Sequence, residues 1–165
     1  MFSPAMIARM LIILSLLIGQ IFLIAPPAAA AELSLFKGQT VYVPVYSHIY
    51  SGDREQPFYL AATLSIRNTD LTHAITLTAV DYYDSEGKFL KHYLNAPEPL
   101  NAMATKRYVI PESDKSGGSG AKFIVVWQSR QPVAEPLIES VMISTKTQQG
   151  ISFTSRGRVL ETESP

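Results

Sequence analysis

Residues 59–68 read Tyr-Leu-Ala-Ala-Thr-Leu-Ser-Ile-Arg-Asn and carry the clearest strand pattern of the chain. Apolar side chains occupy the even positions from Leu60 to Ile66, while Ala, Thr, Ser and Arg occupy the odd ones. Alternation with a period of two over this length is typical of a β-strand that buries one face. Asn-Thr-Asp at 68–70 follows as a turn, so the strand is expected to end there.

Strand signals of the same kind recur along the rest of the chain, separated by turn residues. They predict further strands at 40–46, 74–84, 88–94, 100–110, 121–129, 137–145 and 150–160. Seven to eight strands without a convincing amphipathic helix indicate an all-β fold. We expect an immunoglobulin-like two-sheet β-sandwich, or a related barrel, as one domain over residues 32–165.

Three positions refine this prediction. Pro44 has no N–H for a ladder hydrogen bond, so its strand is expected at a sheet edge or with a bulge. The apolar parity changes after Ala79, which predicts a bulge near Ala79 and Val80. Residues 121–129 are apolar on both faces and predict a central strand, with Trp127 packed between the sheets.

The N-terminus carries the features of an export signal. Arg9 is the only charge before an apolar run from Met10 to Ile24, and four alanines at 28–31 offer a cleavage site. This pattern predicts a signal helix and a signal peptide over residues 1–31, removed to leave a protein of the periplasm or cell surface. The alternative is an uncleaved anchor, which would be the chain's only membrane contact.

Composition excludes several functional classes. The chain has 14 basic and 14 acidic residues, so neither nucleic acid nor an anionic surface is expected as a partner. It has no cysteine, which excludes disulfides and thiol chemistry. No cofactor is expected.

Catalytic and metal-binding patterns are weak. The three histidines, His48, His73 and His92, are isolated from one another, and no strand carries two ligands at i, i+2 spacing, so no metal site is predicted. The Gly-Gly-Ser-Gly sequence at 117–120 superficially resembles a nucleophile elbow. It precedes a strand instead of a helix, so Ser119 is not assigned as a nucleophile.

Two sets of residues remain as candidates for recognition. The first is a binding surface built from a polar loop at 47–56 and a flexible, glycine-rich loop at 112–120. Its candidate residues are His48, Tyr50, Gly117, Gly118 and Ser119. The second is a polar site at Arg67 and Asp81, where Asp81 is either a buried acid or a surface partner of Arg67 or Arg107.

Five segments carry a family resemblance, at residues 41–50, 62–70, 82–87, 117–127 and 150–157. Together they resemble an uncharacterised family of exported bacterial domains, known from cyanobacteria and proteobacteria and described only as a domain of unknown function. The resemblance covers roughly residues 38–160. It implies export and a single domain but no activity, substrate or catalytic residue. Lys122 departs from the small polar residue, such as Asn, that the family has there.

These observations favour a non-enzymatic binding or structural module of the cell envelope that recognises a protein or an envelope component. The rival is an enzyme or metal-dependent protein whose site assembles from scattered residues such as His48, Arg67, Asp81 and Ser119. A third alternative is a domain whose exposed edge strand is completed by a partner's strand.

Cleavage of the signal is directly testable by intact mass spectrometry of the protein recovered from the envelope fraction. We expect a chain that starts near Glu32, because the small residues at 28–31 suit signal peptidase. A mass that retains Met1 would instead establish an anchored protein.

Overall fold

The computed structural model describes residues 34–51, 53, 55–145 and 150–163, together with Ser3, Pro4 and Met6. The chain divides into two units, Met1–Glu32 and Leu33–Pro165. Almost all of the predicted signal segment lies outside the described residues, so it stays a prediction. None of the helical structure within the described ranges is long and apolar enough to cross a bilayer.

The described part of the second unit is built from strands. Twelve are present there: β1 (Leu35–Pro44), β2 (His48–Ser51), β3 (Gln56–Tyr59), β4 (Ala61–Arg67), β5 (Ile75–Tyr83), β6 (Phe89–His92), β7 (Glu98–Leu100), β8 (Thr105–Ile110), β9 (Lys122–Ala134), β10 (Leu137–Ser144), β11 (Ile151–Arg156) and β12 (Arg158–Glu163).

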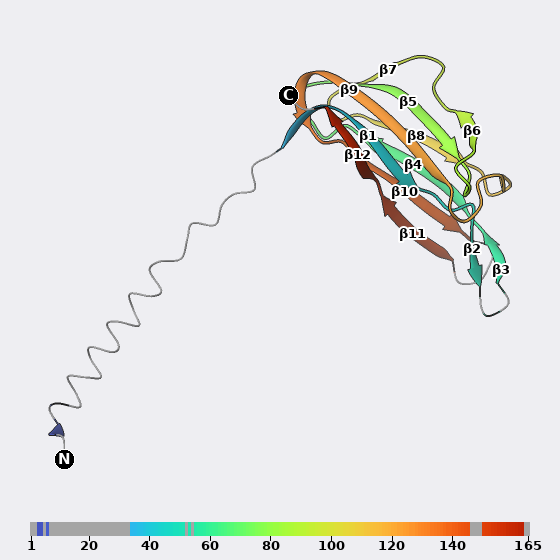
Figure 1. Cartoon of the computed structure of the whole chain (residues 1–165), viewed down its shortest axis with the longest axis horizontal. Coiled ribbons are helices and arrows are strands. Elements are labelled where there is room, and N and C mark those ends of the chain that lie inside the picture. Colours follow the sequence, from blue (N-terminus) through green and yellow to red (C-terminus); the bar gives the residue numbers. More distant parts are fainter. Residues whose placement is uncertain are drawn as a thin grey trace. The chain divides into compact units, whose positions relative to one another are not determined.

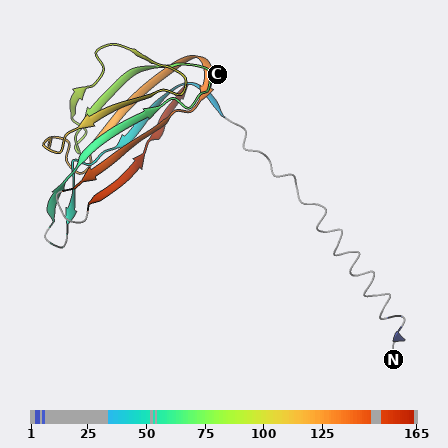
Figure 2. The ribbon, with the colours of Figure 1, turned by 180° about the vertical axis from the view of Figure 1, so that it is seen from behind.

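Two antiparallel sheets form the two layers of the domain (Figures 1 and 2). The 6-stranded sheet has the order β12-β1-β9-β5-β6, with β7 also paired to β5, and the 4-stranded sheet has the order β11-β10-β4-β8. A separate 2-stranded sheet contains β2 and β3. The all-β prediction is therefore confirmed, and the layers are consistent with a sandwich.

The strand count and order differ from the sequence-based expectation. The expected loop at 47–56 contains most of the β2–β3 hairpin, and the expected last strand is divided at Gly157. The first strand, β1, pairs with β9 in one layer, and β10 pairs with β4 in the other.

The core lies between the inward faces of the two larger sheets. Leu60, Leu64 and Ile66 are fully buried, as the alternation of residues 59–68 predicts. Trp127 on β9 is also fully buried, and β9 is flanked by β1 and β5. The predictions of a central strand and of an inward-facing tryptophan are therefore confirmed.

The two predicted irregularities have different outcomes. The register of β5 against β9 shifts between Leu77 and Ala79, which confirms a bulge within one or two residues of its predicted position. Of the two alternatives predicted for the Pro44 strand, the edge position is wrong, because β1 lies between β12 and β9. The bulge is confirmed, because the register of β1 shifts between Thr40 and Val41 against β12 and between Phe36 and Gly38 against β9. Pro44 is tolerated because β12 pairs only with residues 38–42, so no N–H is needed beyond them on that side.

Gly157 marks the place where the chain passes from one sheet to the other. Its N–H donates to the carbonyl of Ile138 at 2.8 Å. A Cβ atom there would lie 2.7 Å from Cγ1 of Val41 and 2.9 Å from the Ile138 oxygen. Only glycine fits this close approach without moving its neighbours, which is why one predicted strand becomes two.

Asn68 closes the corner after β4. The residue is 2% exposed, and its side-chain nitrogen donates to the carbonyl oxygens of His73, Leu100 and Asn101 at 2.9–3.1 Å. This one amide thereby joins the turn at His73 to residues 100–101, which lie more than 30 positions from Asn68 in sequence. Burial of this polar side chain is stabilised because its donors have partners.

Asp70 continues the same corner. Its carboxylate accepts hydrogen bonds from the backbone N–H groups of Thr72, His73 and Ala134. These donors, the Thr72 N–H first among them, hold the pKa of Asp70 well below its usual range. The charged form therefore stabilises the turn and joins it to the end of β9.

Substitution Asp70→Asn tests this contribution. The native state holds the carboxylate charged, so its stabilisation is complete above the unfolded-state pKa of about 4 and is lost as the pH falls below it. We expect the variant to lose about 2 kcal/mol of unfolding free energy at pH 7 and to show a smaller decline between pH 5 and pH 3. Urea unfolding followed by the fluorescence of Trp127 measures both, with Glu86→Gln at an exposed turn as the control. Equal pH slopes in wild type and Asp70→Asn would contradict this account.

Candidate functional site

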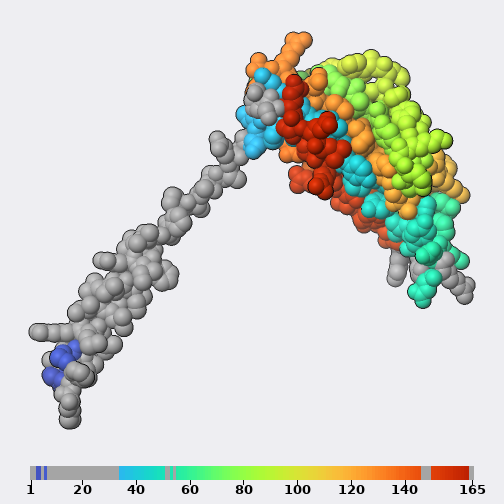
Figure 3. All heavy atoms as spheres, in the orientation of Figure 1, coloured from blue at the N-terminus to red at the C-terminus, as the bar shows by residue number. Residues whose placement is uncertain are grey.

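The β2–β3 hairpin presents the first candidate residues. His48 pairs with Tyr59 and Tyr50 with Pro57, so one face of the hairpin carries two tyrosines and a histidine. The hairpin protrudes at one end of the domain, where it is drawn in teal in Figure 3. Tyr50 is 56% exposed. A large aromatic side chain with this exposure is available to a partner.

The aromatic rings of this face contact one another. The His48 ring meets Tyr50 edge-on at 5.2 Å and Tyr59 at 5.9 Å between centroids. His48 Nε2 lies 3.4 Å from the Tyr50 hydroxyl, while Nδ1 is buried without a hydrogen-bond partner among the described residues. The Nζ atom of Lys115 lies 4.2 Å above the Tyr59 ring, a cation–π contact. The surface of His48, Tyr50, Tyr59 and Lys115 is hereafter the hairpin surface.

The glycine-rich loop is anchored at several points, in contrast to the flexible loop that its composition predicts. Ser85, in the turn between β5 and β6, donates from its N–H and its hydroxyl to the Gly117 carbonyl at 2.9 and 3.1 Å. The same Ser85 hydroxyl accepts from the Gly120 N–H at 2.9 Å. On the other side, the Ser47 N–H donates to the Gly118 carbonyl at 3.0 Å. These bonds compensate for the flexibility that glycine confers on an isolated loop.

Tyr82 explains why the loop needs glycine. Its buried hydroxyl lies 3.3 Å from Ser47 Oγ, and a Cβ atom on Gly117 would come within 1.9 Å of it. Burial raises the pKa of Tyr82, so its hydroxyl stays protonated and available as a donor. Gly118 adopts a φ of +79°, the left-handed region that favours glycine.

The predicted loops therefore lie side by side. His48 follows Ser47, whose N–H binds Gly118, and Lys115 extends from the glycine-rich loop to the hairpin. Gly117 is buried and acts as a support, whereas Gly118 and Ser119 are half-buried. The prediction that these segments share one end of the domain agrees with this geometry, and their role in recognition stays a prediction.

Arg67 and Asp81 do not form a site together. Arg67 lies on β4 and pairs with Glu139 at 3.5 Å, whereas Asp81 lies on β5 and pairs with His92 at 2.8 Å. Both point outward from different sheets, so their side chains lie on opposite sides of the two-layered structure. The predicted polar site is therefore wrong, and the partner of Asp81 is neither Arg67 nor Arg107.

The scattered residues of the rival hypothesis are not brought together either. No hydrogen bond joins Ser119 to a histidine or a carboxylate within the described part of the chain. In the same residues, no group of three or more His, Asp or Glu side chains is placed to hold a metal ion. The geometry offers aromatic contact and hydrogen bonding at the hairpin surface.

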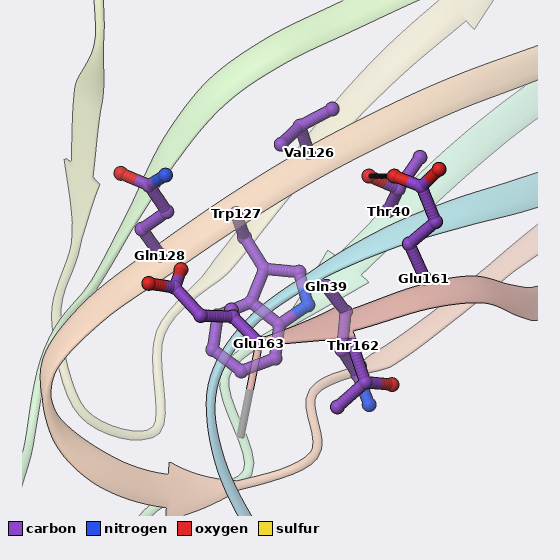
Figure 4. Close-up of a pocket in the computed structure, with 9 residues that line it drawn as sticks. Gln39, Thr40, Val126, Trp127, Gln128, Glu161, Thr162 and Glu163 are labelled. Carbon is purple, nitrogen blue, oxygen red and sulfur yellow. Dashed lines mark hydrogen bonds between the residues drawn. The ribbon is translucent and has the colours of Figure 1, made fainter. Parts of the chain in front are cut away.

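A shallow hollow of about 310 Å³ lies elsewhere and is lined by residues of β12, β1 and β9 (Figure 4). Glu161 and Glu163 project from β12 on one face, and Thr40 Oγ1 lies 3.5 Å from Glu161. The Gln39 Oε1 and Trp127 Nε1 atoms near it are buried without a partner among the described residues. Two carboxylates on the edge strand β12 and one hydroxyl on β1 do not define a ligand, so this hollow is a weaker candidate.

Sequence reasoning missed Tyr59, Lys115, Ser85 and Tyr82 as parts of this region. One signal was present: aromatic residues flank Ser-Gly-Asp at 51–53, a turn sequence between two short strands. Reading it as a hairpin places Tyr59 opposite His48. The contacts of Ser85 and Tyr82 carry no local signal, because they join segments more than 30 residues apart.

Substitution Gly117→Ala tests the support of the surface. The new methyl group would collide with the Tyr82 hydroxyl, so we expect the unfolding free energy to fall by about 1–3 kcal/mol. We also expect amide NMR shifts to change at Ser47 and His48. Gly150→Ala is the matched control, because a Cβ atom there would meet nothing closer than 3.7 Å. Equal stability of the two variants would contradict the packing described.

Comparisons with known proteins place the chain in a family. No curated protein matches it. A solved structure described as Crystal Structure of Thermotoga maritima 1070 is similar at a TM-score of 0.44 and 11% identity, covering 78% of this chain and 97% of that one. The model of the family described as Protein of unknown function (DUF3124) matches residues 38–160, the extent expected from the resemblance. The chain therefore belongs to the DUF3124 family, whose function is not known.

Proposed function

We propose that this protein is an exported, non-enzymatic binding module of the cell envelope, which recognises a protein or another envelope component through the hairpin surface. The observation that carries the proposal is Tyr50, 56% exposed and in edge-on contact with His48 on a protruding hairpin. Its placement outside the cytoplasm is supported by the N-terminal segment, with Arg9, the apolar run and the alanines at 28–31.

The support beneath the surface favours recognition. Tyrosine is enriched at binding hot spots because it offers a large contact area and a polar group at a small cost in conformational entropy. Ser47 and Ser85 hold the neighbouring loop in place before any partner arrives. Binding then loses less conformational entropy than it would with a mobile loop.

Charge and architecture agree with this role. Lys115 adds one positive charge beside Tyr59, so we expect the partner to present an acidic or hydrogen-bonding group there. A rigid scaffold that carries recognition at one end is the arrangement that immunoglobulin-like sandwiches use, and we extend that likeness to this domain as part of the proposal.

A photo-crosslinking amino acid in place of Tyr50, in the full chain expressed in its native host, tests the proposal. We expect one discrete envelope adduct, identified by mass spectrometry. Once that partner has been purified, the Tyr50→Ala variant should bind it at least tenfold more weakly than the wild type does, because an aromatic hot spot contributes about 2 kcal/mol. Phe89→Ala, which removes another exposed aromatic ring on β6, is the matched control and should bind as wild type.

Two outcomes would contradict the proposal. The first is the absence of any adduct at position 50 while a probe at position 89 gives one. The second is stoichiometric metal that survives dialysis and is lost in His48→Ala, which would establish the rival, metal-dependent reading.

A further inference from the structure

The outer face of the 4-stranded sheet carries a row of charged residues that the hairpin surface does not use. The strand registers align Arg107 on β8 with Ser65 on β4, Ser65 with Glu139 on β10, and Glu139 with Arg156 on β11. Figure 2 shows these four strands side by side. Neighbouring strands lie about 4.8 Å apart, so the two outer arginines are about 14 Å apart at the backbone.

Only part of this positive charge is compensated. Arg67, two residues beyond Ser65, pairs with Glu139 at 3.5 Å and donates from Nε to Ser65 Oγ at 3.2 Å. Glu139 is the one carboxylate among the outward residues of these strands within the described ranges. Arg107 and Arg156 are exposed, and neither forms an ion pair with any carboxylate that the structure describes. Two guanidinium groups therefore remain available.

Apolar residues adjoin the charged row. Val109, Thr63, Val141 and Thr154 form the next row across the sheet, and Ile143 lies one row beyond. Val109 is 52% exposed and Ile143 is 45% exposed. The face thus combines exposed aliphatic side chains with a cationic border.

We propose that this face is a second docking surface, which binds a protein that presents carboxylates beside an apolar patch. Guanidinium groups pair bidentately with carboxylates, and the adjoining Val109 and Ile143 give the partner apolar area to cover. The outward residues of β4, β8, β10 and β11, all of which the structure describes, include no aromatic ring for stacking on a sugar. An excess of two positive charges is also below the basic clusters that bind anionic lipid. This inference does not depend on the hairpin surface.

The arginines have an alternative role as guards of the sheet. They lie on β8 and β11, the two edge strands, and charged side chains on edge strands hinder pairing with other chains. That role needs a charge of either sign, whereas docking of a carboxylate needs a positive one. Charge reversal therefore separates the two explanations.

The probe is an eight-residue synthetic peptide in which Glu and Val alternate, added to the full chain at low ionic strength. We expect saturable binding by fluorescence anisotropy, weakening with added salt, and amide NMR shifts at Val109 and Val141. The double variant Arg107→Glu, Arg156→Glu should bind at least tenfold more weakly. Arg130→Glu, an exposed arginine on β9 of the other sheet, is the matched control and should bind as wild type.

The other outcomes overturn the proposal. They are no binding of the peptide, an equal loss in Arg130→Glu, or tighter binding of a sulfated polysaccharide or of phosphatidylglycerol vesicles. If the double variant does not fold, the same binding measurement is made on the double variant Arg107→Gln, Arg156→Gln. Aggregation of that variant with unchanged peptide binding would establish edge protection instead. The Tyr50→Ala variant should bind the peptide as the wild type does. A failure of the docking proposal for the 4-stranded sheet is therefore distinguishable from a failure of the proposal for the hairpin surface.

Discussion

The hydroxyl of Tyr82 is the point at which the core of this domain meets its candidate surface. The Tyr82 ring packs against Phe123 at 5.1 Å between centroids, on the inner face of the 6-stranded sheet. Its oxygen extends to the end of that sheet and lies between Ser47 and the space that a Gly117 side chain would fill. A single side chain thus sets both the position of the hairpin's first residues and the identity of a loop residue. Movement of Tyr82 would disturb the hairpin surface even though the ring itself is buried.

The opposite end of the strands has its own polar anchor. Asn68 and Asp70 use side-chain groups to satisfy backbone groups of the turn at 72–73 and of the end of β7. Buried polar groups with complete hydrogen bonding specify one arrangement of the chain, because any other leaves a donor or an acceptor unpaired. The two ends of the domain are therefore organised by the same physics, although among the described residues the exposed ring of Tyr50 belongs to the hairpin end.

The hairpin surface and the outer face of the 4-stranded sheet depend on different physical properties of the fold. The hairpin surface depends on exposed aromatic area that is supported from below by the glycine-rich loop. The face of the 4-stranded sheet depends on the outward parity of its strands, which brings Arg107 and Arg156 into register with Glu139. Arg107, Ser65 and Glu139 come from strands that are distant in sequence, so no local motif predicts the row.

Local patterns in the sequence determined the all-β class, the inward residues of β4, the bulge in β5 and the central position of β9. Each of these follows from the alternation of side chains across a strand, which a run such as Leu60 to Ile66 displays by itself. The tertiary structure determined the sheet order, the interior position of the Pro44 strand, the anchoring of Gly117 and the separation of Arg67 from Asp81. These depend on which strands become neighbours, and packing between residues far apart in the chain sets that choice. The alternation of a strand reveals that one face is buried, but it does not reveal which partner covers it.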